Sequence, residues 1–176
     1  MSSTLNAEEM EAGVDRLAEL ILAGTEGRSI ALVGIRRRGD EVAERLRDRL
    51  AARGREVDFG TLDISLYRDD YEHLRENPQL QGSDIVFEVD GAQIVLVDDV
   101  LFTGRTIRAA LDAISDYGRP GRVELAVLID RGHRELPIQP DYVGIPLETD
   151  RHDHVHVSLA NTDGEDKVEV RKKQNP

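Results

Sequence analysis

Two aspartates and a glycine-containing turn lie close together in the middle of the chain, and their types suit a phosphorylated sugar. Asp98 and Asp99 follow the apolar run at residues 93–97, at what we expect to be a solvent-facing strand end, and residues 103–106, Thr-Gly-Arg-Thr, open the next helical pattern. Carboxylates accept hydrogen bonds from vicinal hydroxyls, and N–H groups at a helix start bind phosphate. The segment therefore predicts a ribose 5-phosphate site, although the tetrapeptide alone fits an ordinary helix cap equally well.

Two further apolar runs end in loops that are rich in charge and glycine. Residues 29–35 lead into residues 36–39, Arg-Arg-Arg-Gly, and residues 123–129 lead into residues 130–135, Asp-Arg-Gly-His-Arg-Glu. Ligands of open parallel sheets bind at the carboxyl ends of the strands. The three loops are therefore expected to converge on one site, where the arginines supply positive charge for an anion.

The elements that must position these loops alternate between strand and helix patterns. Apolar residues recur at helical spacing in residues 7–23, 42–50 and 107–114. The runs at residues 29–35, 93–97 and 123–129 lack polar alternation, which is typical of parallel strands covered on both faces. Another strand is expected at about residues 56–66. This order predicts an α/β fold with a doubly wound, mostly parallel sheet.

Two regions fall outside this alternation. Residues 67–83 are polar and show no sustained period, which fits a long loop or a mobile hairpin; loops of that length are usually lids or disordered. The C-terminal third contains short strand patterns at residues 141–144, 155–159 and 168–170. These strands are expected to form an appended edge or hood.

The composition limits the class of protein. The length of 176 residues, with 39% hydrophobic residues, predicts a single domain over residues 1–176. The absence of cysteine excludes disulfides, thiolate catalysis and cysteine-based zinc sites. A net charge of −12 opposes general attraction to nucleic acid or anionic membranes. Because there is neither a signal-peptide pattern nor a run of about 18 apolar residues, we expect a cytoplasmic protein without membrane association.

The segment at residues 95–106 is similar to the motif with which type I phosphoribosyltransferases bind 5-phosphoribosyl 1-pyrophosphate (PRPP). Together with residues 67–70, Tyr-Arg-Asp-Asp, and residues 130–137, Asp-Arg-Gly-His-Arg-Glu-Leu-Pro, it resembles the bifunctional pyrimidine operon attenuator/uracil phosphoribosyltransferase (PyrR) family. The resemblance extends from about Leu5 to Val170. It implies the type I phosphoribosyltransferase fold, with a small hood made of C-terminal and N-terminal segments and a flexible loop.

The resemblance implies an enzyme of pyrimidine salvage, a uracil phosphoribosyltransferase that converts uracil and PRPP to UMP and pyrophosphate. Mg²⁺ is the implied cofactor, held through PRPP with no direct protein ligand. The implied catalytic residues are Asp98 and Asp99, which hold the ribose hydroxyls, and Arg68, which meets the pyrophosphate when the loop closes. The implied substrate-binding residues are Arg37, Arg38, Gly39, Asp98, Asp99, Val100, Leu101, Phe102, Thr103, Gly104, Arg105, Thr106 and Arg131.

Several side chains have more than one interpretation. Arg68 suits a surface ion pair with a neighbouring aspartate as well as a ligand contact. His133 suits an orienting or packing role better than that of a general base, because uracil N1 reacts without a strong base once its carbonyls are held. His154 and His156 share one strand face. Without a third nearby ligand, a solvated edge strand fits them better than a metal site.

Family members that regulate transcription bind messenger RNA, and the resemblance implies a basic dimer face for this purpose. The family's first helix has a Thr-Arg pair with a His three residues on, where this chain has Asp15, Arg16 and Glu19; a usually basic position is Gln139, although Arg151 keeps a charge. Acidic side chains repel phosphate, so binding to pyr leader mRNA is expected to be weakened.

UMP-dependent regulation of pyrimidine operon expression is therefore a second hypothesis beside the enzyme. The alternatives are an RNA-binding transcriptional attenuator with weak catalysis and a phosphoribosyltransferase for another base. The resemblance also implies a homodimer or a higher homo-oligomer.

Overall fold

A six-stranded sheet forms the middle layer of the structure, a computed structural model that describes residues 2–69 and 82–173. Its strands stand in the order β4-β3-β2-β5-β6-β7. Neighbouring strands are parallel except for β3 and β4, which confirms the predicted α/β class with a mostly parallel sheet. The strands are β2 (Ala31–Arg36), β3 (Asp58–Asp63), β4 (Asp84–Ile85), β5 (Gln93–Leu101), β6 (Arg122–Asp130) and β7 (Tyr142–Pro146).

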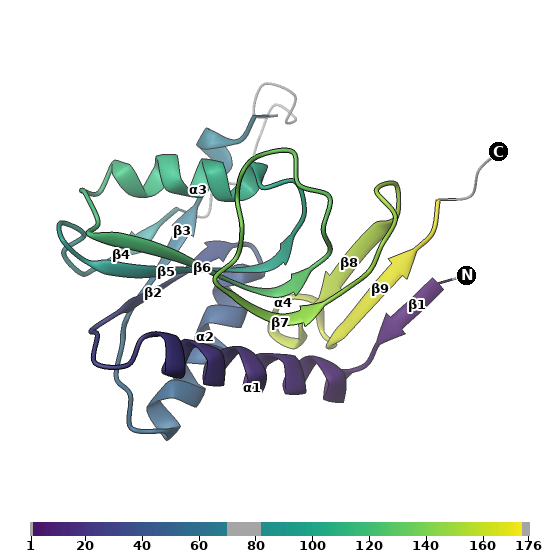
Figure 1. The fold of residues 1–176 in the computed structure, drawn as a ribbon, viewed down its shortest axis with the longest axis horizontal. Coiled ribbons are helices and arrows are strands. Elements are labelled where there is room, and N and C mark those ends of the chain that lie inside the picture. Colours follow the sequence, from purple (N-terminus) through teal and green to yellow (C-terminus); the bar gives the residue numbers. More distant parts are fainter. Residues whose placement is uncertain (1, 70–81, 174–176) are drawn as a thin grey trace.

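Helices cover both faces of this sheet (Figure 1). The helices α1 (Ala7–Gly24) and α2 (Gly39–Ala52) pack against one face, and α3 (Arg105–Ser115) covers the other. The connection after β2 leads to β3 on one side, whereas β5 pairs with β2 on its other side. The loops that follow β2 and β5 therefore open beside each other, where open α/β sheets bind ligands.

Two apolar clusters form the core, one on each face of the sheet. The first cluster contains Met10, Leu17 and Ile21 of α1, all fully buried, as their helical spacing predicts. A reciprocal capping box begins this helix: Glu9 N donates to Asn6 Oδ1 at 2.9 Å, and Asn6 N donates to Glu9 Oε2 at 2.8 Å. The apolar pattern of α1 therefore packs this helix against one face of the main sheet.

A separate antiparallel sheet forms the hood, in the order β1-β9-β8. It combines β1 (Ser2–Leu5) from the N-terminal segment with β8 (His154–Ser158) and β9 (Lys167–Arg171) from the C-terminal segment. The four-residue helix α4 (Ala160–Asp163) lies between β8 and β9 in the chain. Figure 1 shows this hood beside the carboxyl end of the main sheet.

Two elements differ from the predictions, and a third resolves an alternative. β5 does not end before the aspartates, because its pairing with the long strand β6 continues to Leu101 opposite Asp130. The strand expected at residues 141–144, in an appended edge or hood, is β7, which pairs parallel to β6 at the edge of the main sheet. β3 occupies only Asp58–Asp63 of the expected residues 56–66, and the 3-10 helix η1 (Ser65–Tyr67) follows it.

Most of the predicted long loop at residues 67–83 lies outside the described residues, and Asp70 lies there too. The end of this segment is anchored at the end of β3. Gly82 N donates to Asp63 Oδ2 at 3.0 Å, and Asp63 N donates to Ser83 Oγ at 2.8 Å. Within residues 2–69 and 82–173, no helix is long and apolar enough to cross a membrane.

Candidate active site

Asp98 and Asp99 lie near the carboxyl end of β5, and only one of them matches the expected solvent exposure. Asp98 is 4% exposed rather than solvent-facing, because the strand continues beyond it and the β2–α2 loop covers it; Asp99 is partly exposed. Burial raises the pKa of Asp98 well above its ordinary value, and the charge of Asp99 adds to this. Burial also raises the pKa of Asp99, although bonds from its neighbours and the charge of Arg38 oppose the rise.

The loop after β2 lies directly against Asp98. A Cβ atom on Gly39 would lie 2.6 Å from Val97 O and 3.0 Å from Asp98 Cα, so only glycine fits this approach. Arg38 precedes it in the left-handed region with φ 77°, and its guanidinium is partly buried. The side chain of Arg37 is exposed. The expected arginine-rich loop and the aspartate pair are thus brought together.

The turn before α3 has the geometry expected of a phosphate-binding segment. Gly104 is the N-cap of α3 in the left-handed region with φ 94°. Since glycine has no side chain with which to cap the helix, the first N–H groups of α3 are available for an anion. Thr103 Oγ1 accepts a hydrogen bond from Arg105 N at 3.3 Å. Thr106 is exposed in the first turn.

A cavity of about 260 Å³ opens beside this turn. It is lined by Arg68, Asp69, Thr103, Arg105 and Thr106. Arg105 Nη1 donates to Asp69 Oδ2 at 2.9 Å, and Arg108 contacts the other oxygen of the same carboxylate. The structure therefore places Arg68 close to this turn, with cationic, hydroxyl and carboxylate groups around one hollow.

The loop after β6 supports the backbone of this turn. Arg134 Nη1 donates to Phe102 O at 3.0 Å, and its other nitrogens bind Asp130 Oδ1 at 2.8 Å and Ile138 O at 3.0 Å. Thr103 O accepts hydrogen bonds from the two backbone N–H groups that follow Arg134. Arg134 is not among the site residues predicted from the sequence. Arg134 stands in the string at residues 130–137 that carries the family resemblance, and this was the one sequence signal that pointed to it. The sequence does not distinguish an arginine that binds carbonyls from one that binds a ligand.

Arg131 lies inside the protein between the β5–α3 turn and the hood. It is 5% exposed, its guanidinium carbon lies 4.0 Å from the centre of the Phe102 ring, and Nη2 donates to Asp150 O at 3.1 Å. Its Nε is buried without a hydrogen-bond partner. Burial lowers the pKa of Arg131. An orphaned donor at this position is suited to a polar ligand atom.

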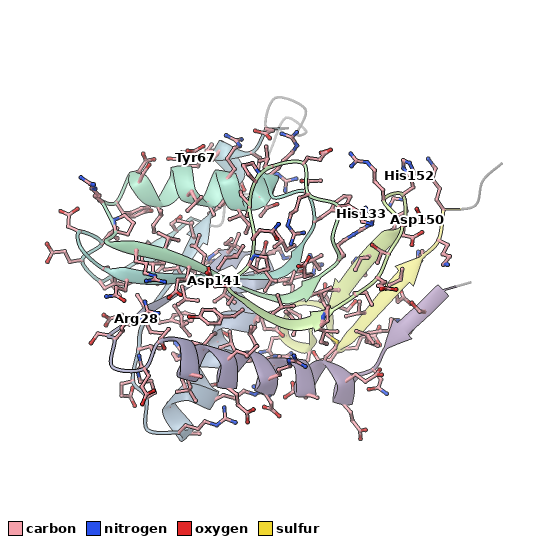
Figure 2. All side chains as sticks on the ribbon, in the orientation of Figure 1. Arg28, Tyr67, His133, Asp141, Asp150 and His152 are labelled. Atoms are coloured by element: carbon pink, nitrogen blue, oxygen red, sulfur yellow. The ribbon has the colours of Figure 1, made fainter. Side chains whose placement is uncertain are left out.

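His133 is held in the way expected of an orienting residue. Its Nε2 lies 2.6 Å from Thr149 O, and its ring contacts Phe102 edge-on at 6.4 Å between centroids. Figure 2 shows His133 close to Asp150, at the boundary between the main sheet and the hood. These contacts favour the orienting role over that of a general base.

The remaining predicted residues have apolar side chains that are at least partly buried. The side chain of Leu101 is buried in the apolar core, and Leu101 O accepts a hydrogen bond from Arg131 N at 3.1 Å. Val100 and Phe102 are partly buried. Among the described residues, no group of three or more His, Cys, Asp or Glu is placed to hold a metal ion, and this includes His154 and His156 on β8.

Comparisons with known proteins agree with this arrangement. The family model described as phosphoribosyl transferase domain matches residues 1–162. The chain is 49% identical over 172 residues to the bifunctional protein PyrR of Elusimicrobium minutum, covering 97% of this chain and 96% of that protein. It is 51% identical over 174 residues to the bifunctional protein PyrR of Thermus aquaticus, covering 97% and 95%.

A solved structure shows the same fold at low sequence identity. A hypoxanthine-guanine phosphoribosyltransferase from Bacillus anthracis superposes with a TM-score of 0.70 at 18% identity, covering 96% of both chains. The strand-end site, the matching family model and the near-complete PyrR relatives lead to one conclusion. The chain belongs to the phosphoribosyl transferase domain family and, within it, to the bifunctional PyrR proteins.

Proposed function

We propose that the protein is a uracil phosphoribosyltransferase. N1 of uracil forms a bond to C1′ of PRPP, the bond from C1′ to pyrophosphate breaks, the N1 proton is lost and UMP is produced. The observation on which this depends is the position of the Asp98–Asp99 pair, with the Arg38–Gly39 turn against it and the glycine-capped start of α3 five residues further on. PRPP presents pyrophosphate, ribose hydroxyls and 5-phosphate in a matching order.

The charges of these groups suit the proposed step. Asp98 and Asp99 accept hydrogen bonds from the ribose hydroxyls, and the N–H groups at residues 104–106 bind the 5-phosphate. Arg38 binds the leaving pyrophosphate, whose negative charge grows in the transition state. We further propose that Arg68 meets the pyrophosphate when the segment at residues 67–83 closes, which excludes water from the ribosyl centre.

Magnesium fits this site as part of the substrate. The described residues offer one carboxylate pair and no larger cluster of metal ligands, and such a pair suits Mg²⁺ that keeps most of its ligands from waters and substrate phosphates. When bound with PRPP, Mg²⁺ neutralises pyrophosphate charge as that group departs. Asp98 and Asp99 are the residues that would approach it.

The identity of the base is tested by comparing four candidate bases in parallel assays. We expect purified protein with PRPP and Mg²⁺ to convert labelled uracil to UMP, and to leave hypoxanthine, guanine and orotate unreacted in parallel assays. Arg131, whose buried Nε has no partner, is the side chain proposed to lie near the base. Reaction of another base in the absence of reaction with uracil would refute the choice of substrate.

UMP-dependent binding to pyr leader mRNA is the second candidate function. It is favoured by identity of about half the residues over almost the whole chain with proteins named bifunctional. The residues at the positions aligned with the family's first helix oppose RNA binding, because they are acidic and neutralise arginines. Asp15 pairs with Arg49 at 2.6 Å, and Glu19 pairs with Arg53 at 3.4 Å. A gel-shift assay at low salt with UMP present tests this role, and absence of a shift removes it.

We place the activity in the cytoplasm, where PRPP and UMP are metabolised, and propose a homodimer or higher homo-oligomer as the working form. Light scattering on the eluting peak of a size-exclusion column measures the oligomeric state, and a mass equal to one chain contradicts this part of the proposal.

A further inference from the structure

A bidentate ion pair joins the hood to the loop proposed to bind pyrophosphate. Arg38 Nη2 donates to Asp163 Oδ1 at 2.9 Å, and Arg38 Nε donates to Asp163 Oδ2 at 3.1 Å. The side chains are 26% and 19% exposed. Two parallel hydrogen bonds fix the plane of a guanidinium, which a single contact does not.

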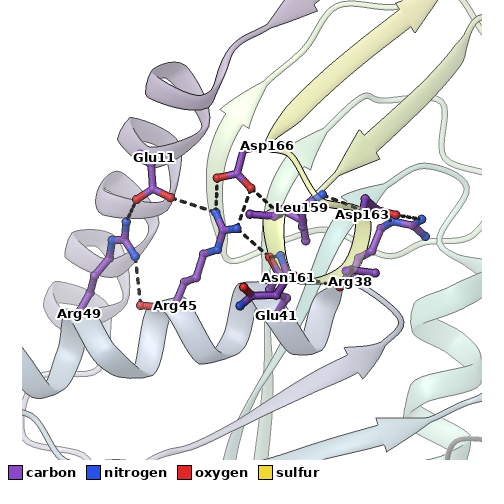
Figure 3. Close-up of polar contacts among 11 residues, drawn as sticks. Glu11, Arg38, Glu41, Arg45, Arg49, Leu159, Asn161, Asp163 and Asp166 are labelled. Atoms are coloured by element: carbon purple, nitrogen blue, oxygen red, sulfur yellow. Dashed lines mark hydrogen bonds and ion pairs between the residues drawn. The ribbon is translucent and has the colours of Figure 1, made fainter.

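Asp163 is itself held in place by the hood. Its Oδ2 also accepts a hydrogen bond from Leu159 N at 2.9 Å. On the same short helix, Thr162 Oγ1 donates to Glu41 Oε1 at 2.9 Å, so α4 is attached to the first turn of α2 (Figure 3). The carboxylate that meets Arg38 therefore has a defined position relative to α2.

A third carboxylate anchors the hood without touching Arg38. Asp166 binds Arg45 on α2 through both oxygens, with Nη2 at 2.7 Å and Nη1 at 2.9 Å (Figure 3). Asp163 and Asp166 thus each make a bidentate pair with an arginine, Asp166 with one inside α2 and Asp163 with the N-cap of α2, and only Asp163 meets the loop beside the aspartate pair. This difference provides a matched control.

Arg38 keeps donors that Asp163 does not use. A guanidinium has five N–H donors, and Asp163 uses one on Nε and one on Nη2. Arg38 stands beside the aspartate pair, because the next residue, Gly39, lies directly against Asp98. Nη1 and the second hydrogen of Nη2 are then oriented by the pair with Asp163.

We propose that Asp163 is a positioning residue that orients Arg38 for the pyrophosphate of PRPP. This inference rests on the proposed function. A free arginine loses rotamer freedom when it binds an anion, and a guanidinium already held in plane loses less. The hood thereby contributes to pyrophosphate binding without contacting the substrate.

The test compares Asp163→Asn with Asp166→Asn in the full-length protein. We expect Asp163→Asn to raise the KM for PRPP and the Kd for pyrophosphate by about tenfold, the effect of one charge-assisted hydrogen bond, with a much smaller change in kcat. The amide oxygen still accepts the bond from Leu159 N, so α4 remains capped. Asp166→Asn should leave both constants within about twofold of wild type, as expected of an ion pair away from the ligand.

A double-mutant cycle separates positioning from a general effect on the fold. In an Arg38→Gln background, Asp163→Asn should cause no further loss of PRPP binding, measured by calorimetry, because the side chain that it orients is gone. Equal effects of Asp163→Asn and Asp166→Asn, or additive losses in the cycle, would overturn the role. Tighter PRPP binding by Asp163→Asn would also overturn it, because Asp163 would then compete with pyrophosphate.

The proposed function and the positioning role of Asp163 are refuted by different results. Wild-type protein that neither binds PRPP nor forms UMP refutes the proposed function. Wild-type protein that does both, together with indistinguishable Asp163→Asn and Asp166→Asn variants, refutes the positioning role alone.

Discussion

Asp98 combines a proposed ligand role with a location that disfavours its charge. Burial and the neighbouring Asp99 raise its pKa. A carboxyl whose folded-state pKa lies above its unfolded value stabilises the fold fully below the unfolded pKa, and this contribution is lost as pH rises through the folded pKa. Ionisation of Asp98 in the folded site therefore lowers stability, a cost that proteins often accept where function requires it.

We expect Asp98→Asn to be more stable than wild type and nearly inactive. The gain should be about 1 kcal/mol, or roughly 2–4 °C in the temperature of unfolding. It should be larger at pH 8 than at pH 5, because a raised folded-state pKa makes only the wild type lose stability as the pH rises above the unfolded-state pKa. Thermal unfolding at the two pH values and UMP synthesis measure the effects. A variant that is less stable at pH 8 and fully active would contradict both assignments.

Gly39 provides a steric test of the same site. Because a Cβ there would overlap Val97 O at 2.6 Å, Gly39→Ala should displace the loop and weaken PRPP binding by about 100-fold, the usual result of a shift near 1 Å. The matched control is Gly54→Ala, at φ 78° with no heavy atom within 4 Å of the new Cβ. Gly54→Ala should lower stability without weakening PRPP binding. Equal PRPP affinity of the two variants would contradict the placement of PRPP at this site.

Residue types and spacing predicted which residues lie together better than they predicted the environment of those residues. The carboxylate pair, the Thr-Gly-Arg-Thr turn and Arg37 to Gly39 were all predicted from type and spacing. The burial of Asp98 was not, because the apolar run ends before it and local sequence does not show that β6 continues the pairing. The ion pair of Arg38 with Asp163 joins residues 125 positions apart and has no local signal.

At the level of elements, the loop after β6 forms a support for the phosphate turn. Arg134 binds three acceptors in partly buried positions, and two of them are backbone carbonyls. The apolar and glycine patterns predicted the strands and helices that flank this loop. They did not decide between an edge and a hood for β7, since a five-residue strand at the edge of a sheet resembles a hood strand in sequence.

We expect Arg134→Gln to destabilise the protein by about 1–3 kcal/mol, because buried acceptors lose their donor, and to raise the KM for PRPP. Arg151→Gln is the matched control, since Arg151 makes one ion pair to Glu135 with a side chain that is 50% exposed, and should cost less than about 1 kcal/mol. Denaturant unfolding and initial rates measure both effects. Equal stability of the two variants would refute the support role.

At the level of the whole molecule, the distribution of charge separates the two candidate functions. Paired helices place Glu11, Asp15 and Glu19 of α1 against Arg45, Arg49 and Arg53 of α2. Three arginines are thus neutralised within the chain, whose net charge is −12. The two apolar clusters lie on opposite faces of one sheet. That residues 1–176 form a single domain stays a prediction.

Removal of two of these acids should increase affinity for RNA. Asp15→Asn with Glu19→Gln removes the partner of Arg53, leaves Arg49 paired with Glu11 and lowers repulsion. Leader RNA should therefore bind more tightly than to wild type, with a steeper dependence on salt. Gel shifts at several salt concentrations measure this. Unchanged binding and an unchanged salt slope would show that this face does not contact RNA.

The most direct test of the central claim is a crystal structure of the protein with UMP. We predict that both ribose hydroxyls lie within hydrogen-bonding distance of the Asp98 and Asp99 carboxylates, and that the phosphate lies on the N–H groups at residues 104–106. UMP bound at another place, with this strand end free of ligand, would contradict the assignment of the site.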